Sequence, residues 1–182
     1  MSEQKKKEIT LADIQREVAA SNQNAAAEAG ESRQLIIFKL NGEEYALPID
    51  QIKEVVLTPG IAKIPHTAPY IKGVANIRGT IITIMDLEER FNLTTNSDKD
   101  YKSFHYTLVI ESESHKVGVL VKEVPNTLNV SESEIDRSSG VVQYSSLDAD
   151  CIDGIVKSGN RLIVLIDFFR MMETAELAEA SY

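Results

Sequence analysis

The side chains that most often carry out chemistry are few in this sequence and lie far apart. Its three histidines, His66, His105 and His115, each stand beside a polar or turn residue, and none has the spacing of a metal site. Cys151 is the single cysteine and begins an apolar stretch, where a cysteine is more often a small buried side chain than a nucleophile. No glycine-rich phosphate loop is present. We therefore expect no enzymatic activity, no metal and no cofactor.

Arg78 is the unusual polar residue of a stretch that otherwise reads as two apolar strands. Residues 70–87, YIKGVANIRGTIITIMDL, predict a strand, a tight turn and a second strand. Gly79 supplies the tolerance of positive φ that such a turn needs. Two interpretations of Arg78 stay open. It is either a turn cation that is solvated or paired with a nearby acid, or a residue placed for binding; the candidate acids are Glu54, Glu88 and Glu89.

Composition limits the classes of protein that these elements can form. The chain has 182 residues, 43% of them hydrophobic, with no Trp and many β-branched side chains, which favours one or two small β-rich domains with a real core. Its net charge of −9 argues against binding to nucleic acid or to anionic membrane surfaces. No apolar run approaches the roughly 20 residues that span a bilayer. A single cysteine excludes an internal disulfide framework and fits a reducing cytoplasm.

Residues 1–33 differ in composition from the rest and are expected to form a flexible N-terminal tail. A short helix is possible at residues 10–20, because Thr10 can cap it and Leu11, Ile14 and Val18 fall on one face. Two alternatives remain, a mobile tail with a frayed helix and a short helix that docks on the body or on a partner.

From residue 34 the pattern is one of short strands joined by tight turns. Asn41-Gly42 is a strong hairpin signal between the first two strands, and residues 168–180 predict a helix with an apolar face. The expected strands are residues 35–40, 44–49, 52–57, 106–112 and 116–124, the pair within 70–87 and a second pair within 151–167.

An internal repeat relates the two halves of this body. Gly73 precedes Asp86 by 13 residues, and Gly154 precedes Asp167 by the same 13 residues within a similar strand pair. A similar hairpin lies upstream of each pair, so the same five-strand unit is used twice, which favours small closed or partly open barrels. Arg78 aligns with a glycine of the second half, so the hairpin itself does not require an arginine.

The sequence resembles the CheW family of chemosensory adaptors over residues 33–178. The resemblance is carried by IKEVV, by YIKGVANIRGTIITIMDL, by KVGVLVKEV and by IDGIVKSGNRLIVLID, and its most specific part is the segment 73–79. It implies an all-β fold with a C-terminal helix, in which two SH3-like five-stranded β-barrels are packed side by side. Residues 34–178 would form this CheW-like domain as two intertwined barrel subdomains, and 179–182 would be the C-terminal end.

The resemblance also implies partners and binding residues. A member of this family is a non-catalytic adaptor, cytoplasmic and located at membrane-associated receptor arrays, that couples chemoreceptors to the histidine kinase CheA. Arg78 and Glu54 would pair beside a groove for the cytoplasmic tip of the receptor. The other expected receptor-binding positions are Gly73, Ile52, Leu108, Gly118 and Val124. The expected contacts with the regulatory domain of CheA are Ile49, Leu57, Ile135 and Val141.

Two other hypotheses stay open at this point. A CheW-like binding module of a non-flagellar system, such as pilus motility or another sensory kinase pathway, would have the same fold. An enzyme or small-ligand protein built on a double barrel would need a cluster of polar residues between the barrels, and the sequence shows none. The chain departs from the family pattern at Thr83, where a proline is common, and at residues 136–138, which lack the prolines of the family.

Overall fold

The structure, a computed structural model, describes residues 31–93, 104–138 and 151–179. These residues divide into two compact units, each built around one β-sheet. Unit 1 comprises residues 50–86 and 104–123, and unit 2 comprises 31–49, 87–93, 124–138 and 151–179. The expected helix at residues 10–20 lies outside the described residues.

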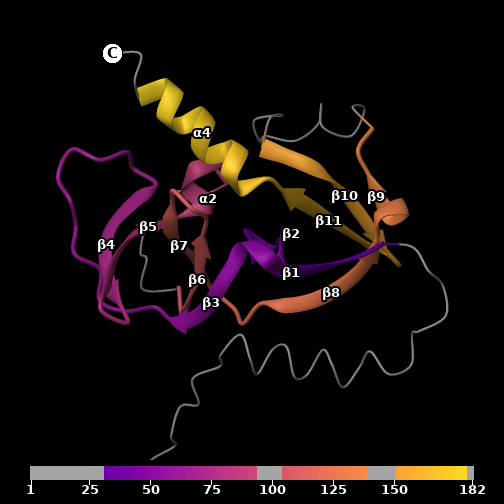
Figure 1. Ribbon diagram of the computed structural model, residues 1–182, viewed down its shortest axis with the longest axis horizontal. Helices are drawn as coiled ribbons and strands as arrows, with labels where there is room; N and C mark the ends of the chain where they lie inside the picture. Colours follow the sequence, from indigo (N-terminus) through magenta and orange to yellow (C-terminus); the bar gives the residue numbers. More distant parts are fainter. Residues whose placement is uncertain (1–30, 94–103, 139–150, 180–182) are drawn as a thin grey trace, which may run out of the picture. The chain divides into compact units, whose positions relative to one another are not determined.

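Unit 1 contains a five-stranded sheet with the strand order β3-β6-β7-β5-β4. Its neighbours are antiparallel except β5 and β7, which pair in parallel. The inward side chains gather into one cluster that includes Ile82, Phe104 and Leu120. The strands are β3 (Ile52–Leu57), β4 (Ile71–Ile77), β5 (Thr80–Met85), β6 (Tyr106–Glu111) and β7 (Lys116–Val121) (Figure 1).

Unit 2 contains a six-stranded sheet with the strand order β8-β1-β2-β11-β10-β9. Here β2 and β11 form the parallel pair. Its strands are β1 (Ser32–Leu40), β2 (Glu43–Pro48), β8 (Asn126–Ser131), β9 (Ile135–Asp136), β10 (Ile152–Ser158) and β11 (Arg161–Ile166). Its helical segments are α2 (Leu87–Arg90), η4 (Glu132–Glu134) and α4 (Phe168–Glu179), and the 3-10 turn η2 (Ile49–Gln51) leads into unit 1.

The two sheets repeat the same topology strand by strand, which confirms the repeat expected from the sequence. Strands β3, β6, β7, β5 and β4 of unit 1 correspond in order to β8, β1, β2, β11 and β10 of unit 2. Both Gly73 and Gly154 follow a register shift in the first strand of their hairpin. Even β9 has a counterpart in unit 1, the single bridge between Ala62 and Val74.

The units are nevertheless not the two halves of the sequence. Each hairpin that stands upstream in one half joins the sheet of the other half: β1–β2 pairs with β8 and β11, and β6–β7 pairs with β3 and β5. This exchange makes the chain intertwined, because it leaves unit 2 after residue 49, returns to it at residue 87, crosses unit 1 again at 104–123 and re-enters unit 2 at residue 124.

Local sequence explains the hairpin turns but not every strand. At the first turn Asn41 and Gly42 have φ of 47° and 85°, the doubly positive pattern of a two-residue hairpin turn. The expectation of an all-β fold with a C-terminal helix is confirmed. Strand β8 was not expected, because its mixture of Asn, Thr and Ser with two apolar residues resembles a loop until β1 pairs with it. Within the described residues, no helix is long and apolar enough to span a bilayer.

Candidate functional site

Arg78 lies at the turn between β4 and β5 and is held there by Glu54 of β3. The Arg78 Nε donates to Glu54 Oε2 at 2.5 Å, and the neighbouring Gly79 N–H donates to Asn76 Oδ1 at 2.8 Å. Strands β3 and β4 are the two edges of the unit 1 sheet, so this ion pair joins the tip of one edge hairpin to the opposite edge strand. The pairing expected from the resemblance is therefore confirmed.

The backbone of Arg78 adopts a conformation that long side chains rarely take. Its φ is 50°, a left-handed conformation that is unfavourable for a long side chain. The equivalent residue of unit 2 is Gly159, with φ of 60°, which adopts the same conformation without that penalty. Turn geometry alone would favour glycine at both positions.

The charges of this pair are unequally exposed. The Arg78 side chain is 63% exposed, whereas that of Glu54 is 15% exposed. The carboxylate thus anchors one edge of the guanidinium while most of the side chain faces solvent. A planar cation fixed in this way can donate hydrogen bonds to carbonyl or carboxylate oxygens of a partner with little further loss of entropy.

An exposed apolar side chain follows Arg78 by three residues in the same hairpin. Ile81 of β5 is 65% exposed, and Leu162 at the equivalent position of β11 is 63% exposed. The two hairpins therefore offer similar apolar surface, but only the hairpin of unit 1 carries an arginine at its turn. This difference gives a matched pair of sites for experiment.

Two of the expected receptor-binding positions are glycines at which the backbone is crowded. Gly73 has φ of 137°, and a Cβ there would collide with the Ala62 carbonyl oxygen and lie 2.8 Å from its carbon. At Gly118 of β7 a Cβ would meet the side chains of Ile84 and Thr107, each at 2.7 Å. Both glycines allow close packing within unit 1, so substitutions there would change the shape of this unit.

The remaining expected positions differ in burial. Ile52 and Leu108 lie in unit 1 with 3% and 0% exposure, so their side chains do not form part of the surface. Val124 falls in unit 2 and is 38% exposed. Their assignment to receptor binding stays a prediction.

The expected kinase contacts show the same variety. Leu57, at the end of β3, is 37% exposed and Ile49 is half-buried. Ile135 is 6% exposed and belongs to the hydrophobic cluster of unit 2, and Val141 lies outside the described residues. Of the three that the structure describes, Leu57 is the most exposed.

The sequence reasoning missed a second arginine–glutamate pair, in unit 2. Arg161 donates from Nε and Nη2 to the two carboxylate oxygens of Glu44, at 2.8 and 2.7 Å. The hydrogen bond from Arg161 lowers the pKa of Glu44, and the bond to Glu44 raises the pKa of Arg161. The two residues are 117 positions apart, so no local pattern indicates the pair. The one available signal was that each residue lies beside the turn of a predicted hairpin.

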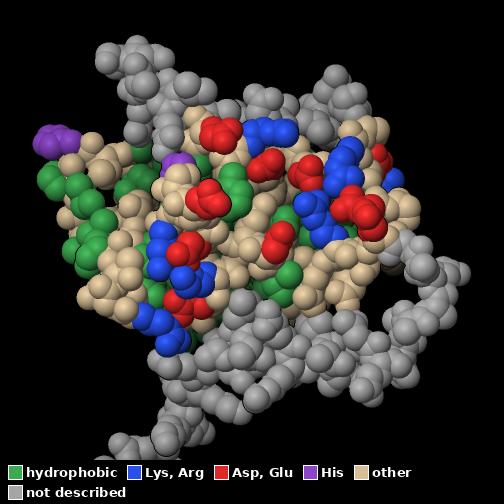
Figure 2. Space-filling view, in the orientation of Figure 1, with side chains coloured by type: hydrophobic (Ala, Val, Ile, Leu, Met, Phe, Trp, Pro, Cys, Tyr) green, Lys and Arg blue, Asp and Glu red, His purple; other side chains and the backbone are tan. Residues whose placement is uncertain are grey.

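The cysteine and the three histidines lie in different surroundings. Cys151 is 1% exposed, and His66 and His105 are exposed. His115 shares a 2.8 Å hydrogen bond with Ser114 in the β6–β7 turn. Among the described residues, no three His, Cys, Asp or Glu side chains are grouped so that they could hold a metal ion. On the face in view in Figure 2, acidic and basic side chains are intermixed rather than separated by sign.

Comparison with known proteins adds to this geometry. The model of the CheW-like domain matches residues 34–176. The chemotaxis protein CheW of Bacillus subtilis is 34% identical over 142 residues, which cover 78% of this chain and 87% of the relative. The chemotaxis protein CheW of Helicobacter pylori is 30% identical over 156 residues, which cover 86% of this chain and 90% of the relative.

A solved structure shows the same fold. The scaffolding protein TtCheW of Thermoanaerobacter tengcongensis superposes with a TM-score of 0.66 at 28% identity, over 76% of this chain and 90% of that one. The family model matches nearly the whole described body, and the named relatives are covered over most of their length. This chain therefore belongs to the CheW-like domain family and has the role of a chemotaxis adaptor.

Proposed function

We propose that this chain is a non-catalytic adaptor that couples chemoreceptors, the methyl-accepting chemotaxis proteins, to the histidine kinase CheA. It would work in the cytoplasm at membrane-associated receptor arrays, with one surface for the receptor tip and another for the regulatory domain of the kinase. The observation that supports receptor binding is the state of Arg78. This arginine is exposed, has an unfavourable backbone conformation and pairs with Glu54, whereas the equivalent residue of the repeat is a glycine.

The receptor surface would combine a directed cation with an apolar contact. A receptor tip is a helical hairpin, and an amphipathic helix presents both an apolar stripe and polar groups at its border. Ile81 would supply apolar contact, and the guanidinium of Arg78 would donate to oxygens of the helix. Hydrogen bonds to charged groups contribute about 1.5–3 kcal/mol, so loss of the guanidinium should weaken binding roughly tenfold or more.

The receptor experiment compares matched variants by titration calorimetry with a receptor tip fragment. Arg78→Gln and Ile81→Ser should weaken binding, whereas Leu162→Ser removes an equally exposed apolar side chain from the other hairpin and should leave binding unchanged. Equal effects of Ile81→Ser and Leu162→Ser, or unchanged binding by Arg78→Gln with a normal circular dichroism spectrum, would refute the assignment.

Glu54→Gln separates two roles for the arginine. A glutamine at position 54 keeps an oxygen that can accept from Arg78 but removes the charge that anchors it. If Arg78 contacts the receptor directly, Arg78→Gln weakens binding more than Glu54→Gln does. If the pair only shapes the site, the two variants weaken binding equally.

The kinase surface is tested separately through Leu57. Because Leu57 is exposed at a strand end, Leu57→Ser should leave the fold intact and weaken binding to the CheA regulatory domain. The same variant should bind the receptor fragment normally, and Arg78→Gln should bind the kinase domain normally. This reciprocal pattern is what two separate surfaces on one adaptor require, and a joint loss in either variant would argue against it.

A further inference from the structure

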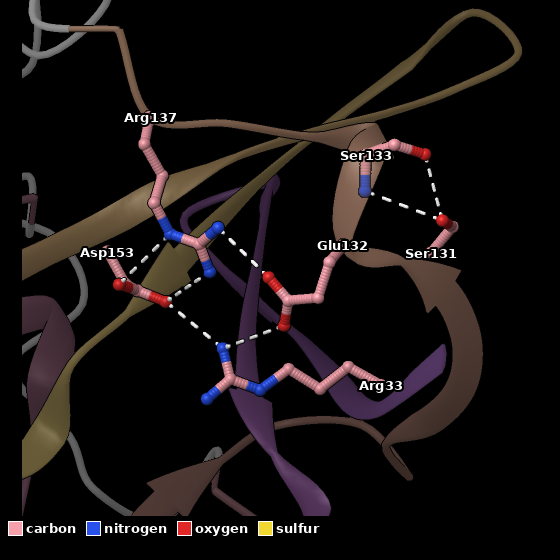
Figure 3. Close-up of polar contacts among 6 residues, drawn as sticks. All are labelled: Arg33, Ser131, Glu132, Ser133, Arg137 and Asp153. Atoms are coloured by element: carbon pink, nitrogen blue, oxygen red, sulfur yellow. Dashed lines mark hydrogen bonds and ion pairs between the residues drawn. The ribbon is translucent and has the colours of Figure 1, made fainter. Parts of the chain in front are cut away.

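Four charged side chains from four segments of unit 2 form a closed ion network (Figure 3). They are Arg33 of β1, Glu132 of η4, Arg137 just after β9 and Asp153 of β10. Each carboxylate contacts both guanidinium groups. A network of this kind is more strongly coupled than isolated surface pairs, because each member is held by two others.

The two arginines use their nitrogens differently. Arg33 reaches both acids with a single atom: its Nη1 lies 3.2 Å from Asp153 Oδ2 and 3.7 Å from Glu132 Oε1. Arg137 uses three atoms, Nη1 to Glu132 Oε2 at 3.0 Å, Nη2 to Asp153 Oδ2 at 3.3 Å and Nε to Asp153 Oδ1 at 3.5 Å. The planar fork is thus necessary at position 137 and dispensable at position 33.

Among the described residues, the network adds to a short strand pairing and to local hydrogen bonds of the segment 132–138. Strand β9 pairs with β10 through two residue pairs, Ile155 with Asp136 and Val156 with Ile135. Close approach is possible because Gly154 has no side chain: a Cβ there would lie 2.7 Å from Ile135 Cγ2 and 3.0 Å from the Asp136 carbonyl oxygen. Short-range bonds order the same segment, namely the capping box of η4 and the bond from the Ser138 N–H to Asp136 Oδ1.

Residues 132–138 also form part of the protein surface. Ser133, Glu134, Arg137 and Ser138 are exposed, while Ile135 points into the hydrophobic cluster of unit 2. Its position therefore decides both the shape of this surface and the packing of the cluster beneath it.

We propose that the Arg33–Glu132–Arg137–Asp153 network positions residues 132–138 and thereby sets the affinity of this chain for the regulatory domain of the kinase. The inference rests on the proposed function for its partner, and it assigns Arg33 and Arg137 as positioning residues for the contact near Ile135. The ion network links the start of β1 to β9 and β10, so this contact depends on a residue about 100 positions earlier in the chain.

The test measures amide hydrogen exchange of the peptide 131–138 and kinase-domain binding in the same set of full-length variants. Arg137→Gln should speed exchange roughly fourfold or more, since one exposed ion pair accounts for about two- to fivefold and two are lost. Arg137→Lys should behave like Arg137→Gln, and Arg33→Lys should remain close to the wild type, because one ammonium can replace one Nη1 but not a fork.

Arg161→Gln is the matched control. Arg161 is in the same unit, its side chain is 47% exposed against 43% for Arg137, and its partner Glu44 lies outside the network. This variant should leave exchange of 131–138 and kinase binding unchanged. High salt should speed exchange of this peptide in the wild type and have a smaller effect in Arg137→Gln, which keeps only the two ion pairs of Arg33.

The outcomes separate this inference from the proposed function. Faster exchange in Arg137→Gln and Arg137→Lys, together with weaker kinase binding, supports the proposal. Unchanged exchange overturns it, and so does faster exchange with normal kinase binding while Leu57→Ser still loses binding. If the wild-type chain does not bind the kinase domain at all, the proposed function fails and the assigned partner fails with it.

Discussion

Replacing Gly73 by alanine should destabilise unit 1 strongly, although it adds a single methyl group. Two effects contribute. The φ of 137° lies in a region that residues other than glycine rarely adopt, so placing alanine there costs about 1–3 kcal/mol. The added Cβ would also displace the Ala62 carbonyl, which accepts from the Val74 N–H at 2.9 Å while the Ala62 N–H donates to the Val74 carbonyl at 2.8 Å.

Losing both hydrogen bonds adds about 1–3 kcal/mol, so the total cost is about 4 kcal/mol, a large part of the stability of a small domain. The measurement is urea unfolding followed by circular dichroism. Gly79→Ala is the control, because Gly79 also has positive φ, 83°, but a Cβ there meets nothing within 4 Å. Its expected cost is only about 1–2 kcal/mol.

Equal losses of stability for Gly73→Ala and Gly79→Ala would refute this reasoning, because the collision with Ala62 is what distinguishes them. The prediction bears on the site as well. If Gly73→Ala weakens receptor binding, the loss would follow from the displaced segment around Ala62, and the unfolding midpoint would fall in the same variant. Weaker binding with an unchanged midpoint would instead favour direct contact at Gly73.

Two further predictions concern buried or paired carboxylates in unit 2. Glu88 is 2% exposed and accepts from the Asn41 N–H at 2.9 Å, so Glu88→Ala should cost about 1–3 kcal/mol in urea unfolding and Glu88→Gln, which keeps an acceptor, clearly less. The hydrogen bond from Arg161 lowers the pKa of Glu44 below its ordinary 4.5, so the folded state binds fewer protons there than the unfolded state does. That stabilisation is complete above about pH 4.5 and is lost as the pH falls through the folded-state pKa; accordingly, the difference in unfolding midpoint between wild type and Arg161→Gln should shrink from pH 6 to pH 3, and a constant difference would contradict it.

The sequence alone determined the parts of this protein that depend on neighbouring residues. The Asn41-Gly42 and Arg78-Gly79 turns, the strands beside them and the C-terminal helix follow from local propensity and from the turn residues Asn41, Gly42 and Gly79, which accept positive φ. The repeat then predicted that one strand arrangement is used twice, and the segment 73–79 indicated the family. The turns, strands and helix depend on interactions between residues close in the sequence, and the repeat and the family segment are visible by comparing residue types alone.

Tertiary structure decided what depends on distant pairing. A hairpin pattern does not say which sheet the hairpin joins, and here the parallel pairing of β2 with β11 places the first hairpin in the sheet of the second half. Of the acids considered as partners of Arg78, Glu54 is the one that pairs with it, while Glu88 is buried and bound to Asn41. The network around Arg33 likewise has no local signal, because charges of opposite sign occur everywhere along a solvated surface and only the folded sheet brings these four together.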